Sequence, residues 1–242
     1  MQKPRIPRDV ATSFKKCWPA GIVNEFVAGD SYFHAVHARV DRDLRKIRGA
    51  SLLWQTLDDE ESQVEGSADE PATAEWQSYH VFFLAPLGDA FHVEDEAETI
   101  EESVQTEGDD AQSAWTESPS EEWIGCAAGV CLAAPYAAIN FDLYALYEDG
   151  TTRTPDVESF IYSDTGRDRI DTIHYYREIL SPAAFQTLTS LGDRIASVLA
   201  KHHIRVLNDS VLNVRVPDLR ASQEVFLEEP LRVRDALFYR GV

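Results

Sequence analysis

The sequence predicts a single α+β domain spanning residues 1–242, with a mostly antiparallel sheet flanked by helices at about 31–48 and 182–203. Three observations predict it. The two helical segments carry apolar residues at three- and four-residue steps, which draws one apolar stripe on each helix. The apolar segments between them are short and either alternate with polar residues or are apolar throughout, as strands do. An Asp-Gly pair at 149–150 marks a tight hairpin between two of these strands.

The N-terminal part predicts two helices. Residues 7–17 form a short one, which Pro19 and Gly21 end. The second begins after a cap at Asp30 or Ser31 and ends at Gly49. Basic side chains gather in its C-terminal half, where the helix dipole favours cations. Its apolar stripe consists of Phe33, Val36, Val40, Leu44 and Ile47.

The middle of the chain predicts strands. Residues 50–57 read as a strand, and residues 78–85 are apolar on both alternating faces, which is typical of a central strand covered on both sides. Residues 123–135 are mostly small, and their periodicity leaves a buried strand and a tightly packed helix both open. Residues 139–148 alternate as a strand, and after the Asp-Gly turn the expected partner strand is 157–164.

The longest helix is expected in the C-terminal third. Ser181 is placed to cap its start, and Pro182 takes the first helical position. After this helix, residues 204–207 and 211–216 predict two short strands, and the final apolar residues close the core.

The net charge of −20 is concentrated in one central block. Residues 49–152 contain 24 Asp and Glu and no Lys or Arg. Most of these carboxylates fall in two polar stretches, 58–75 and 94–122, which we expect to leave the sheet as acidic insertions. Low hydrophobicity with charge of one sign is also the composition of disordered chain, so solvated loops without a binding role remain an alternative.

Composition and motifs exclude several classes of protein. There is no glycine-rich nucleotide loop, no H-E-x-x-H and no G-x-S-x-G, so no cofactor is expected. No apolar run reaches the ~20 residues of a membrane helix, and the basic N-terminus lacks the apolar core of a secretory signal. Three cysteines are too few for a disulfide framework and read as reduced thiols, which predicts a cytoplasmic protein. A strongly negative field repels nucleic acid.

The acidic block favours a non-enzymatic protein that engages a basic protein partner. Charge of one sign steers an oppositely charged partner, and tryptophan often carries the binding energy of interfaces. The most concrete version is an immunity protein that neutralises a toxin; a chaperone for a secreted effector and a mimic of DNA are alternatives. The expected partner-binding residues are Trp76, Glu94, Asp95, Glu96, Glu101, Glu102, Asp109, Asp110, Trp115 and Trp123.

The alternative is a metal-dependent hydrolase or another enzyme with a site near His34, His37 and Asp41. Their spacing places them near one face of the expected helix, and histidine with carboxylate suits zinc or manganese. The competing interpretation is that His37 simply packs at the edge of the core. A second group, His174 with His202 and His203, is open to the same doubt, because histidines at a helix end more often contact the terminal carbonyls.

The two cysteines of the small-residue segment are expected to be core residues. Cys126 and Cys131 lie five positions apart and would therefore point to opposite faces of a strand, so neither a disulfide nor a shared metal is expected there.

Overall fold

The fold is known from a computed structural model that describes residues 5–23, 33, 35–56, 78–94, 119–147, 150–153, 155, 176–222 and 230–238. In chain order its elements are α1 (Arg8–Cys17), β1 (Ile22–Val23), α2 (His37–Leu44), β2 (Ala50–Gln55), β3 (Tyr79–Pro86), η3 (Asp89–Phe91), β4 (His92–Glu94), β5 (Glu121–Cys131), β6 (Tyr136–Leu146), β7 (Thr152–Arg153), α6 (Pro182–Lys201), β8 (Arg205–Val206), α7 (Asp209–Leu212), β9 (Arg220–Ala221) and α8 (Val233–Leu237).

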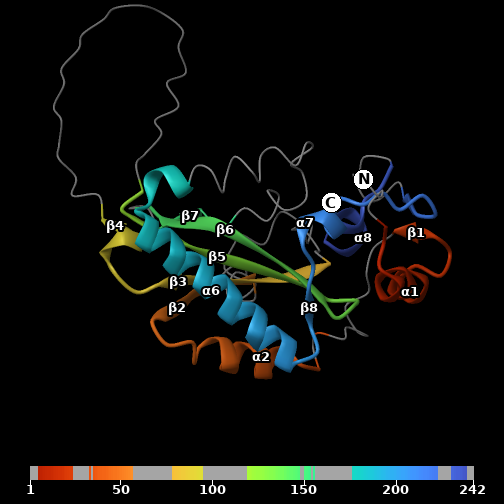
Figure 1. The fold of residues 1–242 in the computed structure, drawn as a ribbon, viewed down its shortest axis with the longest axis horizontal. Helices are drawn as coiled ribbons and strands as arrows, with labels where there is room; N and C mark the ends of the chain where they lie inside the picture. Colours follow the sequence, from red (N-terminus) through yellow and green to blue (C-terminus); the bar gives the residue numbers. More distant parts are fainter. Residues whose placement is uncertain are drawn as a thin grey trace, which may run out of the picture.

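A central sheet organises these elements (Figure 1). Its strands lie in the order β2-β3-β5-β6-β7, and every neighbouring pair along this path is antiparallel. Strand β4 pairs with β5 beyond the end of β3, and β8 adds a short parallel pairing to β6. The α+β class with a mostly antiparallel sheet is thereby confirmed.

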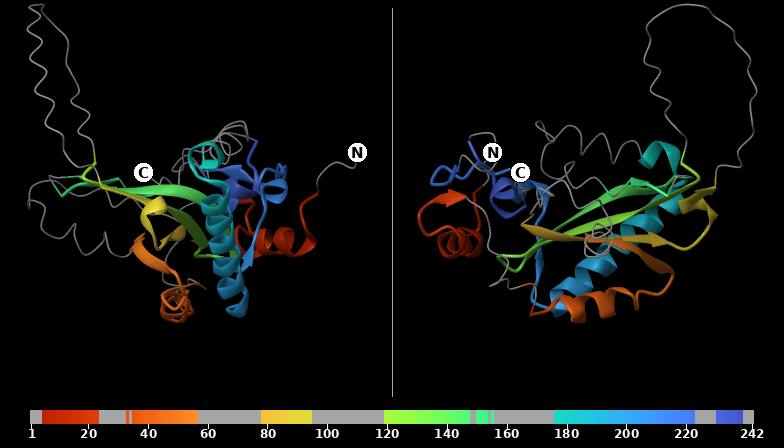
Figure 2. Two further views of the ribbon diagram at one scale, coloured as in Figure 1. Left: turned by 60° about the vertical axis from the view of Figure 1, so that its left-hand side comes forward. Right: turned by 180° about the vertical axis from the view of Figure 1, so that it is seen from behind.

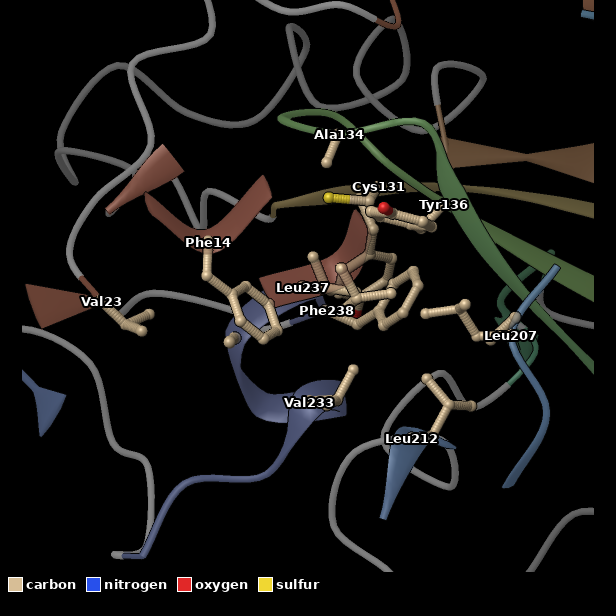
Figure 3. Close-up of a cluster of buried hydrophobic side chains, with 14 of the residues drawn as sticks. Phe14, Val23, Cys131, Ala134, Tyr136, Leu207, Leu212, Val233, Leu237 and Phe238 are labelled. Atoms are coloured by element: carbon tan, nitrogen blue, oxygen red, sulfur yellow. The ribbon is translucent and has the colours of Figure 1, made fainter. Parts of the chain in front are cut away.

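Each face of the sheet is buried under its own helices. Helices α2 and α6 cover one face, where Val40, Leu188 and Leu191 pack on Phe82 and Leu84 of β3. The other face meets α1, α7 and α8 in a second core (Figure 3), which consists of buried residues including Phe14, Tyr79, Val81, Phe83, Cys131, Leu212, Val233 and Phe238. All eight positions of β3 are buried, as expected for a strand covered on both sides.

The two cores confirm the expected positions of the cysteines. Cys126 belongs to the core under α6 and Cys131 to the core under α1 and α8, so their side chains point to opposite faces of β5. Burial raises the pKa of the Cys131 thiol to about 12, and it raises the pKa of Cys126 further still. Both thiols are therefore protonated and unreactive at neutral pH.

The expected helix starts and strands agree with the structure in most places. The Ser181 hydroxyl accepts a hydrogen bond from the N–H of Ala184 at 3.2 Å, and Pro182 is the first residue of α6. Helix α1 matches the expected segment to within one residue. The small-residue segment is a strand, β5. The expected helix at 31–48 is shorter, and α2 covers only its middle.

The expected strand at 211–216 is wrong in its first part, although Arg215 forms an isolated antiparallel bridge with Arg232. Residues up to Leu212 instead form the short helix α7, because the Asn208 side chain accepts a hydrogen bond from the N–H of Val211 at 3.1 Å and so caps a helical turn. The strand partner expected at 157–164 lies outside the described residues. Within them, the turn at Gly150, whose φ is +83°, leads directly into β7.

The second acidic insertion also begins and ends differently from the expectation. Glu94 still belongs to β4, and Glu121 and Glu122 already belong to β5, so the second insertion is narrower than 94–122. The backbone register places Glu94 directly opposite Glu121. The stretches 58–75 and 95–118 lie outside the described residues.

Helices α1 and α8 lie together at one end of the sheet, and β4 lies at the other, as both views of Figure 2 show. The part of the sheet next to the second acidic insertion therefore lies at the end away from α1 and α8, although Trp123 and Tyr144 there still pack against the core of Figure 3. No helix within the described ranges is long and apolar enough to cross a membrane.

Candidate functional site: an aromatic row beside a pocket

Three rings form a row across β4, β5 and β6. His92 is the register partner of Trp123, and Trp123 is the register partner of Tyr144. Residues directly opposite on antiparallel strands share a face and lie close enough to touch. The His92 and Trp123 rings stack at 4.9 Å and 7°, and the Trp123 and Tyr144 rings are tilted at 5.4 Å and 32°. We call His92, Trp123 and Tyr144 the aromatic row.

A glycine makes room for the fourth ring of this group. Phe83 from β3 lies 6.0 Å from Tyr144, measured between ring centroids. A Cβ on Gly125 would collide with the Leu84 carbonyl oxygen and would approach the Phe83 ring to 2.6 Å. Gly125 lies two positions after Trp123 and therefore on the same face of β5. The absence of a side chain at this position allows Phe83 to reach the aromatic row.

A carboxylate borders the row. Glu121 lies two positions before Trp123 on the same face of the strand. Its Oε2 lies 3.2 Å from Nε2 of His92, within hydrogen-bond distance. The side chains of His92 and Glu121 are 30% and 39% exposed, so solvent reaches both of them. A partner can therefore approach the aromatic row and this carboxylate together.

A pocket of about 160 Å³ opens beside the row. It is smaller than the ~300 Å³ at which sites for small molecules begin. It therefore suits one side chain better than a cofactor. The pocket is lined by Ser51, Leu53, Ala85, Pro86, Leu87, Gly88, Asp89, His92 and Trp123.

Of the residues expected to bind a partner, Trp123 and Glu94 fall within the described ranges. Trp123 is half-buried at the centre of the aromatic row, and the backbone of Glu94 pairs with that of Glu121. The other expected residues lie outside the described ranges: Trp76, Asp95, Glu96, Glu101, Glu102, Asp109, Asp110 and Trp115.

Sequence reasoning missed His92, Tyr144, Glu121, Leu87 and Asp89. The alternation of β6 places Tyr144 on a definite face, but only the pairing of three strands brings it beside Trp123. The exposed Leu87 sits in a Pro-Leu-Gly sequence that predicts a turn, which is the one sequence feature that could have drawn attention to it.

The residues of the metal-site alternative are engaged elsewhere as far as the structure describes them. The His37 ring packs at 5.7 Å over Phe82 and at 4.7 Å from the His80 ring, measured between centroids. Both Asp41 carboxylate oxygens accept from Arg45 Nε, at 3.0 and 3.1 Å. His34 lies outside the described residues, and within them no group of three potential metal ligands occurs.

The histidine at the end of α6 joins two helices. Nε2 of His202 lies 3.2 Å from Oδ2 of Asp43 in α2, so its side chain contacts a carboxylate rather than the terminal carbonyls that the sequence led us to expect. His174 lies outside the described residues. His202 therefore has a structural partner in α2, on the face of the sheet that α2 and α6 cover.

No protein-family model, curated protein or solved structure matches this chain.

Proposed function

We propose that the protein is a non-enzymatic, cytoplasmic binding protein that engages a basic protein partner through the aromatic row and the acidic block. Its most concrete version is an immunity protein that neutralises a toxin. The observation that carries the proposal is the position of Trp123, which is half-buried between two rings with Glu121 on the same face.

The distribution of charge supports a basic partner. Residues 49–152 contain 24 carboxylates, and this part of the chain has no lysine or arginine of its own with which to neutralise them. Glu121, whose side chain is 39% exposed, adds a solvent-accessible carboxylate beside the aromatic row. A cation from a partner would pair with this carboxylate, and the wider field would attract the partner from a distance.

The exposed apolar residue at the pocket supports binding to a protein. Leu87 is 66% exposed, and its side chain borders the pocket that Trp123 also lines. An apolar group next to a tryptophan with acid around it has the composition of an interface, in which a few anchors carry most of the energy within a polar rim.

The proposal is tested by affinity capture from the native cell at about 0.1 M and about 1 M salt, where the Debye length is about 10 Å and 3 Å. Captured proteins are identified by mass spectrometry, and the purified candidate is then titrated against the wild type. We expect a basic protein that is retained at low salt and released at high salt. Recovery of no basic protein at either salt concentration contradicts the proposal.

A matched pair of variants identifies the part of the chain that binds. The test variant replaces the carboxylates of the acidic block by amides, at Glu94, Asp95, Glu96, Glu101, Glu102, Asp109 and Asp110. The control replaces the same number in the C-terminal part, at Asp156, Glu158, Asp164, Asp168, Asp171, Glu178 and Asp193. Only the replacements in the acidic block should lower the affinity for the captured protein and weaken the dependence of that affinity on salt. Equal losses in both variants would show that net charge, rather than the acidic block, is responsible.

The role of Trp123 is tested by Trp123→Ala. The affinity for the captured protein should fall by about tenfold or more, as at an interface hot spot. Unchanged affinity in a variant that keeps its fold by circular dichroism would remove Trp123 from the interface. To test the immunity version, the captured protein is expressed with and without this chain, and growth should be restored only when both are present.

A further inference from the structure

We propose that the pocket beside Trp123 is a socket for one cationic side chain of the partner, an arginine or a lysine. This inference rests on the proposed function and specifies where the partner is held. The overall charge of the acidic block does not determine which residue of the partner is the anchor, whereas the pocket favours a long cationic side chain.

The size of the pocket limits its occupant. At about 160 Å³ it accommodates one long side chain and excludes a nucleotide or a cofactor of ordinary size. Its walls come from three separate parts of the chain: Ser51 and Leu53 of β2, the end of β3 with the following turn, and the aromatic row. A side chain that enters it is therefore held from several directions.

The lining has the two kinds of surface that a long cation needs. Leu53, Pro86 and Trp123 supply apolar walls for the methylene stem. Asp89, which is exposed, supplies a carboxylate at the same pocket, and Glu121 lies within hydrogen-bond distance of the lining residue His92. An acidic side chain would meet repulsion here, and a purely apolar one would leave the carboxylates without a counter-ion.

The turn after β3 places both kinds of group at the rim. Gly88 has a φ of +128°, a conformation that L side chains rarely adopt. The turn projects Leu87 outward, where it is 66% exposed, and it brings Asp89 to the same pocket. Leu87 is thus positioned to shield a bound head group from water, and ion pairs strengthen as water is excluded.

The socket is tested without knowledge of the partner. The probes are N-acetyl-arginine amide and N-acetyl-lysine amide, and the neutral control is N-acetyl-citrulline amide, which has nearly the shape of arginine without its charge. The readout is the indole N–H resonance of Trp123, assigned by its loss in Trp123→Phe. We expect saturable shifts with both cations and a response to citrulline that is weaker by about tenfold.

Variants locate the binding. Asp89→Asn should weaken both cationic probes by about two- to fivefold, the range for an exposed ion pair. The matched control is Asp193→Asn, an exposed carboxylate of α6 on the other side of the sheet, which should change nothing. Equal responses to citrulline and arginine, no response at Trp123, or equal effects of the two variants would each overturn the socket.

A second measurement separates this proposal from the one on which it rests. Leu87→Ala and Asp89→Asn are titrated with the basic protein captured in the salt experiment, and both should lower its affinity while the folded structure persists. If a basic protein binds the wild type in a salt-sensitive way and binds these variants equally well, the socket is wrong and the proposed function stands. If the small cations bind at Trp123 but no basic protein is captured, the proposed function fails and the socket chemistry remains.

Discussion

Replacing Gly125 by alanine tests the packing that supports the aromatic row. The added Cβ would collide with the carbonyl oxygen of Leu84 and would lie 2.6 Å from the Phe83 ring. The ring can move by rotating about its side-chain bonds. The carbonyl belongs to the backbone of β3, which is paired with β5 from Tyr79 to Leu84 and cannot move without disturbing that pairing.

The same strand contains a matched control. A Cβ on Gly129 would meet nothing closer than 4.0 Å, which is ordinary van der Waals contact. Overpacking a buried site costs about 1–3 kcal/mol, whereas glycine to alanine without strain stabilises by about 0.4–1 kcal/mol through the unfolded chain. The free energies of unfolding of Gly125→Ala and Gly129→Ala should therefore differ by about 1.5–4 kcal/mol.

The difference is measured by urea unfolding and by thermal melting of the two variants beside the wild type. For a chain of this size, each kcal/mol shifts Tm by about 2–4 °C, so the two melting temperatures should differ by roughly 3–16 °C. Near-ultraviolet circular dichroism should also change in Gly125→Ala alone, because Phe83 is displaced from Tyr144. Equal stability of the two variants, or the larger loss in Gly129→Ala, would refute the packing described for β5.

Three further predictions concern other parts of the fold. A hydrogen bond from the Lys46 ammonium lowers the pKa of Asp43 below its ordinary value of 3.8. The stability that ionised Asp43 contributes is therefore fully present above pH 3.8, and it is lost as the pH falls through the lowered pKa of the folded protein. Asp43→Asn should therefore be less stable than the wild type at about pH 7, with a smaller difference at about pH 3, as followed by urea unfolding; a difference that grows in acid would contradict this. Ser181→Ala removes the cap of α6 and should cost about 1 kcal/mol in thermal melting, whereas no loss would show that the cap is dispensable. Burial raises the pKa of all three thiols, and the rise is largest at Cys126 and Cys131. Alkylation of the folded protein near pH 8 should therefore label only the half-exposed Cys17, and that reaction should be slow. Rapid labelling of Cys126 or Cys131 would show that β5 is more open than described.

Local patterns predicted much of the fold. The helix that starts at Ser181 and Pro182 has its cap and its first residue defined by neighbouring side chains, so the sequence is sufficient to place it. The burial of β3 on both faces follows from its unbroken apolar run. The opposite orientations of Cys126 and Cys131 follow from the two-residue period of any strand.

The incorrect strand prediction concerns a segment whose sequence is compatible with both a strand and a helical turn. Residues 211–216 alternate well enough for a strand, but the side chain of Asn208 caps a helical turn that includes Val211 and Leu212, and only the bridge at Arg215 is left of the strand. The aromatic row could not be predicted for a different reason. His92, Trp123 and Tyr144 come from three strands, and their contact depends on a register that no single segment of sequence specifies.

The candidate site was only partly accessible from the sequence for the same reason. Charge counting directs attention to the acidic block and to Trp123 within it. It does not reveal that a turn brings Leu87 and Asp89 to the same pocket as Trp123, because that depends on how β2, β3 and β5 pack together. Charge is a property of composition, whereas a pocket is a property of tertiary structure.

The register between β4 and β5 has a consequence for how this fold can diversify. The chain leaves the sheet after Glu94 and returns at Glu121, and these two residues face each other across one strand pair. Because any sequence that connects them starts and finishes at a single place, we expect that its length can change without shifting a strand. Grafting a different connection between these two glutamates should therefore retarget the scaffold while its core stays the same.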